Sequence, residues 1–129
     1  MKNGFTLIEL IIVLAIMTIL GAIAVPNFLN TSAKARLKAD IQSARVINDA
    51  KDLYENETGD ILNTTATEII KTLFDNGYLK KEYVSQTNSA VWQFEDKIIK
   101  VNITGCDESV KNLYSGLNDD EKLYIKNGS

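Results

Sequence analysis

The sequence contains no histidine, one cysteine and one proline in 129 residues. Without histidine the chain lacks the commonest general base and metal ligand, and it cannot form Ser-His or Cys-His nucleophile pairs. Cys106 has no partner for an intrachain disulfide or for a zinc site, so we expect a small, partly buried core thiol. We therefore predict no catalytic residues, no metal and no cofactor, and a protein that is not an enzyme.

An excess of positive charge is also lacking, because the formal net charge is −3 and no block is rich in Lys or Arg. Nucleic-acid binding normally requires a basic patch or stripe, so we expect no nucleic-acid partner. Acidic residues cluster at Asp119-Asp120-Glu121, close to Gly116 and Asn118. This cluster predicts a solvated loop, with calcium binding as the alternative.

One long apolar run is present near the N-terminus, from Phe5 to Val25. Its only polar members are Thr6, Glu9 and Thr18. As a helix rising about 1.5 Å per residue, the run spans roughly 30 Å, which is the thickness of a bilayer's hydrocarbon core. The run therefore predicts a transmembrane helix.

Two ordinary interpretations of this run conflict with its carboxylate. Lys2 and the small-residue pattern Ala22-Ile23-Ala24 fit a secretory signal peptide, but the run exceeds the usual length of about 7–15 residues. A plain single-pass anchor is the second interpretation. A charge at the bilayer centre costs roughly 2.5–3.5 kcal/mol, so Glu9 indicates a functional role with a partner.

The third interpretation supplies a partner. The stretch Gly4-Phe5-Thr6-Leu7-Ile8-Glu9-Leu10, which follows a short basic leader, resembles the processing motif of type IV pilins and pseudopilins. The resemblance implies that a prepilin peptidase and methyltransferase cleaves between Gly4 and Phe5 and methylates the new N-terminus at Phe5. It also implies that an assembly platform polymerises the subunit, with Glu9 pairing with the N-terminus of a neighbouring subunit.

This implied pairing has a physical basis. An unpaired ammonium or carboxylate is costly once helices bundle and exclude water, and pairing the two removes both penalties. A buried charge pair also fixes the register between subunits. Gly21 and Pro26 weaken the helix and predict a soft segment. In pilins the helix can extend near such a proline when the subunit moves from membrane to filament, and an ordinary kink is the alternative.

The charges around the run bear on localisation. Lys34, Arg36 and Lys38 follow the run, whereas only Lys2 precedes it, so the charge count slightly opposes an outward C-terminal domain. The resemblance implies that outward placement, with a single-pass cytoplasmic membrane protein that later becomes an extracellular surface filament. The low cysteine count and the Lys/Asn/Ile-rich composition suit a Gram-positive host.

The helix is expected to continue beyond the membrane. Between Asn27 and Tyr54 the apolar residues recur at steps of three or four, which predicts an amphipathic helix. Joined to the apolar run, it would form one continuous helix with a length near 75 Å. Thr65-Ala66-Thr67-Glu68 predicts a capping box for a short helix that ends at Gly77. The residues of the long apolar stripe are Leu37, Ile41, Ala44, Ile47, Ala50 and Tyr54.

The remaining sequence predicts a small sheet. Residues 91–95 and 99–103 alternate with period two around Asp96-Lys97, which indicates a hairpin. A short helix or turn follows near Val110, and Leu123-Tyr124-Ile125 suggests a third strand. We predict an α+β fold, with a long N-terminal helix packed against a small antiparallel sheet and one or two short helices. The expected divisions are a leader (1–4), a hydrophobic membrane and filament-core helix (5–26), and an amphipathic helix with a globular headgroup (27–129).

The resemblance implies a filament subunit that serves adhesion, surface motility, biofilm formation or DNA uptake. A pseudopilin of a type II secretion or competence system is the alternative within this family. A membrane-tethered or secreted binding domain with a conventional signal or anchor is the alternative of another class. Many pilins close a C-terminal loop with a disulfide, which the lone Cys106 cannot do, so an adhesive role of that loop is not assumed.

Overall fold

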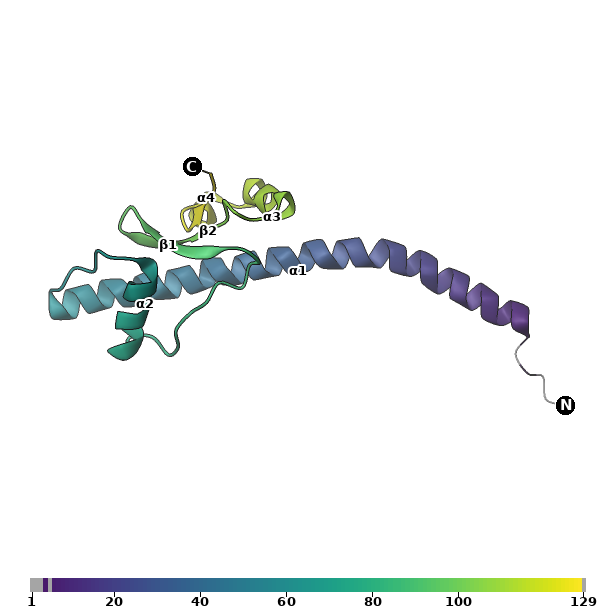
Figure 1. Ribbon diagram of the computed structural model, residues 1–129, viewed down its shortest axis with the longest axis horizontal. Coiled ribbons are helices and arrows are strands. Elements are labelled where there is room, and N and C mark those ends of the chain that lie inside the picture. Colours follow the sequence, from purple (N-terminus) through teal and green to yellow (C-terminus); the bar gives the residue numbers. More distant parts are fainter. Residues whose placement is uncertain (1–3, 5, 129) are drawn as a thin grey trace. The chain divides into compact units, whose positions relative to one another are not determined.

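The computed structural model describes Gly4 and residues 6–128. The chain divides into two units, Met1–Ser32 and Ala33–Ser129, which we call the N-terminal unit and the C-terminal unit. A long helix that starts in an apolar run, a small sheet and short helices confirm the predicted α+β class (Figure 1). In chain order the elements are α1 (Leu7–Thr58), α2 (Ala66–Asp75), β1 (Val91–Glu95), β2 (Ile98–Asn102), α3 (Glu108–Leu113), η1 (Tyr114–Gly116), α4 (Asp119–Lys122) and β3 (Ile125–Lys126).

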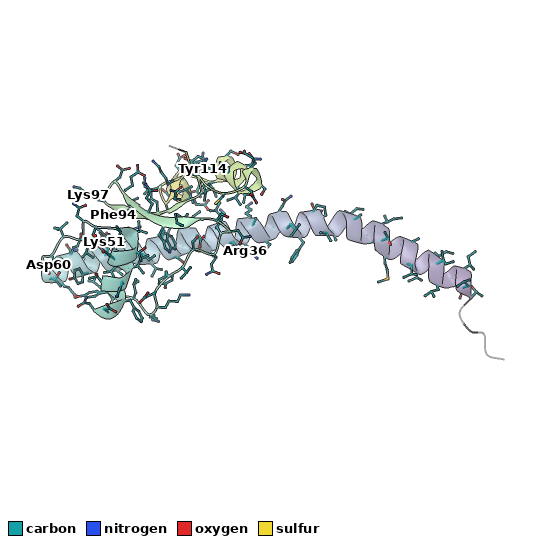
Figure 2. All side chains as sticks on the ribbon, viewed as in Figure 1. Arg36, Lys51, Asp60, Phe94, Lys97 and Tyr114 are labelled. Carbon is teal, nitrogen blue, oxygen red and sulfur yellow. The ribbon has the colours of Figure 1, made fainter. Side chains whose placement is uncertain are left out.

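The described part of the N-terminal unit has no core of its own. Large apolar side chains from Leu7 to Leu29 are 51–75% exposed, and Figure 2 shows them standing out from the ribbon. The most apolar window of α1 has a mean hydropathy of 2.8 and no buried residue, and its length suits a membrane span. A helix that is apolar on all sides requires lipid or another protein around it.

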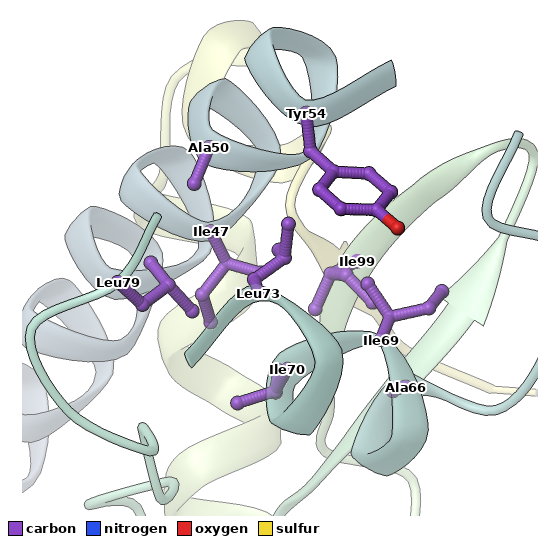
Figure 3. Packing of buried hydrophobic residues seen from close by; sticks show 9 residues of the cluster. All are labelled: Ile47, Ala50, Tyr54, Ala66, Ile69, Ile70, Leu73, Leu79 and Ile99. Carbon is purple, nitrogen blue, oxygen red and sulfur yellow. The ribbon is translucent and has the colours of Figure 1, made fainter. Parts of the chain in front are cut away.

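The C-terminal unit is organised on the second half of α1. All six residues of the predicted apolar stripe are buried, from Leu37 at 0% exposure to Tyr54 at 9%. Five of the six, all except Ala44, belong to two hydrophobic clusters. The first joins α1 to α2 and to Ile99 of β2 (Figure 3). The second joins Leu37 and Ile41 to residues of β2, β3 and the C-terminal helices. Helix α1 ends at Thr58, beyond the predicted end near Tyr54, and Gly59 follows with φ +79°.

Helix α2 begins with half of the predicted capping box. The hydroxyl of Thr65 accepts a hydrogen bond from the Glu68 N–H at 3.3 Å, as predicted. The Glu68 carboxylate, however, accepts from the hydroxyl of Thr64 and not from the Thr65 backbone. The hydroxyl of Thr64 therefore replaces the backbone donor of the standard box.

The end of α2 confirms the predicted role of Gly77. Its φ of +81° is left-handed, a conformation that glycine adopts without steric cost. The Tyr78 N–H donates to the Leu73 carbonyl at 2.8 Å, and the Gly77 N–H donates to the Phe74 carbonyl at 3.1 Å. These two bonds form a Schellman motif, which directs Tyr78 and Leu79 back toward the first cluster.

The sheet has the order β1-β2-β3. Strands β1 and β2 form the predicted antiparallel hairpin, and its turn residues Asp96 and Lys97 both have positive φ, 55° and 67°. Strand β3 pairs with β2 in parallel, with Val101 opposite Ile125. The prediction of a wholly antiparallel sheet was therefore wrong. The connection of residues 103–124 is long enough to cross over and return the chain in the same direction.

The predicted loop at Asp119-Asp120-Glu121 is instead helix α4. The Asn118 side chain accepts from the Glu121 N–H at 2.8 Å, while a Glu121 oxygen accepts from the Asn118 N–H at 3.4 Å. This complete capping box begins the helix. Glu121 is only 8% exposed and forms an ion pair with Lys38 of α1, whereas Asp119 and Asp120 are exposed, so the prediction of a solvated loop fails at Glu121.

Candidate functional site

The first turn of α1 holds Glu9 in a reciprocal pair with Thr6. The Thr6 hydroxyl accepts a hydrogen bond from the Glu9 N–H at 3.2 Å, and Glu9 Oε2 accepts from the Thr6 N–H at 3.2 Å. This arrangement is a capping box, which satisfies two backbone donors that have no partner inside the helix. The positive end of the helix dipole also favours a carboxylate at this position.

Glu9 is the only ionisable residue of the apolar segment 7–29. The other polar side chain near the middle of the segment is satisfied locally, because the Thr18 hydroxyl donates to the Leu14 carbonyl at 2.8 Å. Within the described residues, Glu9 Oε1 accepts no hydrogen bond, so this oxygen is available to a cation from another molecule. The structure thus places one exposed carboxylate on an otherwise apolar surface.

The predicted processing site is only partly covered by the structure. Gly4 is exposed, and a Cβ at this position would have no atom within 4 Å, so nothing inside the chain requires a glycine here. Phe5 lies outside the described residues. Cleavage between Gly4 and Phe5 and methylation of Phe5 therefore stay predictions.

Gly21 and Pro26 both lie inside α1, which is continuous from Leu7 to Thr58. A Cβ on Gly21 would also meet open space, so packing within the chain does not explain this glycine. Pro26 has no N–H, and the carbonyl of Ala22 consequently lacks its usual helical donor. The softening of this segment stays a prediction.

Two polar side chains buried in the C-terminal unit, Asp40 and Asn48, bind backbone groups of that unit. Asp40 is fully buried and accepts from the Ser85 hydroxyl at 2.7 Å and from the N–H groups of Gln86 and Thr87 at 2.7 and 2.9 Å. These bonds attach the segment between α2 and β1 to α1. We infer that Asp40 has a structural role, since all its partners belong to one loop.

Asn48 makes a similar connection to the sheet. Its side-chain oxygen accepts from the Ile99 N–H at 2.8 Å, and its amide donates to the Ile99 carbonyl at 2.9 Å and to the Ala44 carbonyl at 2.8 Å. Because β3 pairs only with residues 101 and 102 of β2, Asn48 takes the place of a neighbouring strand at Ile99. The sequence pattern contained a signal for both residues, since Asp40 and Asn48 interrupt the buried face of an apolar stripe.

Two ion pairs of α1 have carboxyl groups with altered pKa values. The hydrogen bond from Lys38 is the main cause that lowers the pKa of Glu121. Burial would raise the pKa of Glu55, but hydrogen bonds from Lys51 and from the Leu62 N–H outweigh burial and lower it. Each carboxylate faces a cation or a backbone donor and no open pocket, which is typical of structural ion pairs.

The described residues contain no cluster suited to a metal ion and no reactive thiol. Across Gly4 and residues 6–128, no three His, Cys, Asp or Glu side chains are placed to hold a metal ion. Cys106 is 6% exposed, which confirms the prediction of a core thiol, and its Sγ donates to the Asn88 carbonyl at 3.3 Å. Burial, with a smaller contribution from Asp107, raises the pKa of this thiol, so it is a poor nucleophile.

Comparisons with known proteins bear on the same N-terminal segment. Residues 1–25 match the family model described as the prokaryotic N-terminal methylation motif. The chain is 36% identical over 84 residues to the prepilin peptidase-dependent protein A of Clostridium perfringens and 43% identical over 67 residues to the type IV major pilin protein PilA of Myxococcus xanthus. These comparisons support the resemblance of this chain to the type IV pilin family. The prediction from the Gly4 to Leu10 motif is thereby confirmed.

Each of these matches covers only part of this chain and part of the relative. The matches cover 65% and 46% of this chain, and 58% and 30% of the Clostridium and Myxococcus proteins. A further match, to the type II secretion system core protein G of Aeromonas hydrophila, is 26% identical over 91 residues and covers 64% of that protein. The chain thus spans less than two thirds of each of these relatives. No solved structure matches it.

One residue of the N-terminal site was not singled out from the sequence, namely Thr6. Its capping role was nevertheless encoded, because Thr6 and Glu9 have the Thr-x-x-Glu spacing of a capping box ahead of an apolar run. The structure brings Thr6 and Glu9 together, whereas Gly21 and Pro26 lie more than two turns farther along α1.

Proposed function

We propose that this chain is a structural subunit of a type IV pilus or pilus-like filament. The main observation in favour of this proposal is an apolar helical segment that is exposed on all sides and has one carboxylate, Glu9, in its first turn. A membrane or a bundle of similar helices would cover such a surface, and the homology to pilins favours both in succession. The subunit would first be anchored in the membrane and would then be polymerised through this helix by an assembly platform.

Processing would precede assembly in this proposal. A prepilin peptidase would remove residues 1–4 by cleavage between Gly4 and Phe5, and methylation would follow at the Phe5 amine. Because Gly4 meets no neighbouring atom, a requirement for glycine would come from the peptidase. The membrane and filament-core segment would be residues 5–26, and residues 27–129 would form the amphipathic helix and headgroup.

Glu9 would act as the assembly contact. Its Oε2 is bonded to the Thr6 N–H before assembly, and its Oε1 would accept the cationic N-terminus of a neighbouring subunit. Removing two such charges from water is favourable only when they pair, so helices in the wrong register would bear the desolvation cost without compensation. Gly21 and Pro26 would allow the helix to adjust during this transfer.

Intact mass of the mature protein tests the processing step. We expect a chain that begins at methylated Phe5. A chain that begins at Val25 would indicate a conventional signal peptide, and an uncut Met1 would indicate a plain anchor. Either result would contradict the proposed processing and favour a membrane-tethered or secreted binding domain.

Substitutions at Glu9 test the assembly step. Glu9→Gln keeps an oxygen that can accept from the Thr6 N–H but removes the charge, and Glu9→Leu removes both. We expect both variants to insert in the membrane normally and to form no filaments, as counted by electron microscopy of whole cells. Asp49→Asn is the matched control, because it makes the same change at an exposed carboxylate of α1 and should leave filament number unchanged. If Glu9→Gln formed filaments of normal length and number, the proposed charge-pairing role of Glu9 would be contradicted.

The filament would serve adhesion, surface motility, biofilm formation or DNA uptake. A pseudopilin of a type II secretion or competence system is the second candidate, and the match to the secretion core protein G favours it. Filament length in cells separates the two candidates. Long surface filaments would support a pilus, and short filaments confined to the envelope would support a pseudopilin.

A further inference from the structure

The first cations after the apolar run are two residues of α1 whose charges are not neutralised by the described residues. Lys34 and Arg36 are both exposed, and Figure 2 shows Arg36 standing out from the helix. In the described part of the chain neither residue forms an ion pair, whereas the next cation, Lys38, pairs with Glu121. Arg45 lies over the ring of Tyr124, with 5.6 Å between its Cζ and the ring centroid.

Negative charge is absent from the surrounding sequence. No acidic residue occurs between Glu9 and Asp40. Asp40 itself is buried, and its oxygens accept hydrogen bonds from Ser85, Gln86 and Thr87. The exposed charge on this part of α1 is therefore entirely positive, and we call its two carriers the Lys34–Arg36 pair.

The pair follows the exposed apolar surface of α1 closely enough for its side chains to reach the lipid headgroups. Large exposed apolar side chains continue past the run to Phe28 and Leu29, and Leu29 is 60% exposed. At about 1.5 Å per residue, Lys34 and Arg36 lie roughly 7 and 10 Å farther along the helix. The headgroup layer beyond the hydrocarbon is about 5–7 Å thick. Helical side chains lean toward the N-terminus, so these two lean back toward the apolar run and can reach that layer.

The two side chains also straddle the helix, because residues two apart are separated by about 200° around the axis. We propose that the Lys34–Arg36 pair binds the phosphates of anionic lipid headgroups while the chain is anchored in the membrane. The Arg36 guanidinium can contact a phosphate through two parallel N–H donors, and the Lys34 ammonium acts as a compact charge. Contacts on opposite sides fix the depth of the helix and oppose tilting.

This inference rests on the membrane anchoring in the proposed function and not on polymerisation. A rival partner for the same two cations is an acidic surface of a second copy in the filament. Lipid is favoured because the pair comes five and seven residues after Leu29, the last large exposed apolar residue before it, so that both side chains can reach the phosphates. The experiment distinguishes the two partners.

The test uses the full chain reconstituted in phosphatidylcholine vesicles that contain traces of spin-labelled phosphatidylglycerol or spin-labelled phosphatidylcholine. Electron paramagnetic resonance then measures the fraction of each label immobilised by the protein. We expect about a fivefold preference for phosphatidylglycerol at each contacted site, the size that one basic side chain supplies near an anionic surface. The preference should weaken as salt is raised.

Matched variants locate the preference. The double variant Lys34→Gln/Arg36→Gln should bind both labels equally, while Lys34→Arg/Arg36→Lys should keep the preference because both charges remain. Lys71→Gln is the control, since it removes an exposed cation of α2 and should leave the preference unchanged.

Three results would overturn the inference. They are equal binding of both lipids by the natural sequence, an unchanged preference in the double variant, and an equal loss in the Lys71→Gln control. A double variant that keeps the lipid preference but forms no filaments would assign the cations to a second copy. Conversely, a lipid preference in a chain that never polymerises would contradict only the filament proposal.

Discussion

Single polar residues on the buried face of α1 determine how the rest of the C-terminal unit attaches to this helix. Asp40 binds the loop before β1, and Asn48 binds β2 at Ile99. Both side chains satisfy backbone groups that would otherwise be buried without partners, which costs more than a hydrogen bond gains. At this scale a conservative apolar replacement is therefore damaging even though it preserves the apolar stripe.

Replacing Asn48 tests this conclusion. We expect Asn48→Leu to lower the free energy of unfolding by about 2–4 kcal/mol, because it leaves the N–H and the carbonyl of Ile99 without partners. The measurement is urea unfolding of the full chain in detergent, followed through the fluorescence of Trp92. Gln42→Leu makes a comparable change at an exposed position of α1 and should shift stability by less than about 0.5 kcal/mol. Equal effects of the two variants would contradict the bridging role of Asn48.

At the scale of elements, local signals and backbone strain explain most ends and turns. Gly77 ends α2 in a Schellman motif, and Asn118 with Glu121 begins α4. The hairpin turn differs, because two residues with side chains, Asp96 and Lys97, adopt left-handed φ values where Asp-Gly or Asn-Gly is preferred. The hairpin is therefore less stable than its topology allows.

Relieving this strain should stabilise the protein. We expect Lys97→Gly to raise the free energy of unfolding by about 0.5–1 kcal/mol, which is the left-handed penalty less the extra unfolded entropy of glycine. Thermal unfolding of the full chain in detergent gives the shift in Tm. Lys80→Gly, at an exposed residue that is not among those with positive φ, should give no gain. A Tm for Lys97→Gly at or below that of the natural sequence would mean that the turn is not strained.

At the scale of the whole molecule, the two units obtain their stability from different sources. In the described residues, the C-terminal unit has two hydrophobic clusters and the Lys38–Glu121 ion pair, which join α1 to later parts of the chain. The described part of the N-terminal unit has no buried apolar side chain, so lipid or neighbouring helices must cover it. Folding stability measured on the whole chain therefore reports on the C-terminal unit.

Acid should weaken that unit. The pKa values of Glu55 and Glu121 are lower in the folded protein than the ordinary carboxyl value of 4.5. Their contribution is fully present above that value and is lost as the pH falls through the lowered folded pKa values. We expect the Tm of the full chain to fall between pH 6 and pH 3, and the fall to be smaller in Glu55→Gln/Glu121→Gln. If the double variant showed the same pH dependence of Tm as the natural sequence, these two ion pairs would not cause the acid destabilisation. Asp49→Asn, which lies outside both pairs, serves as the control.

The sequence by itself determined the features that consecutive residues encode. The apolar run, the motif from Gly4 to Leu10, the stripe on α1, the Asp96-Lys97 turn and the glycine end of α2 were all predicted, because each depends on contacts within a few residues. The resemblance to type IV pilins came from the same short range, since the matching family model covers residues 1–25. Short-range contacts require no knowledge of how distant segments meet.

Only the tertiary structure decided the features that join distant residues. The parallel pairing of β3, the burial of Glu121 against Lys38, and the bonds of Asp40 and Asn48 connect positions separated by more than twenty residues, and by 83 in the case of Lys38 and Glu121. From the local sequence alone, a charged or polar residue is predicted to be exposed to solvent. It can be buried only when a partner from elsewhere in the chain compensates its loss of water. For Glu121 that partner is Lys38 of α1, and this one member of the acidic cluster is buried while Asp119 and Asp120 stay exposed.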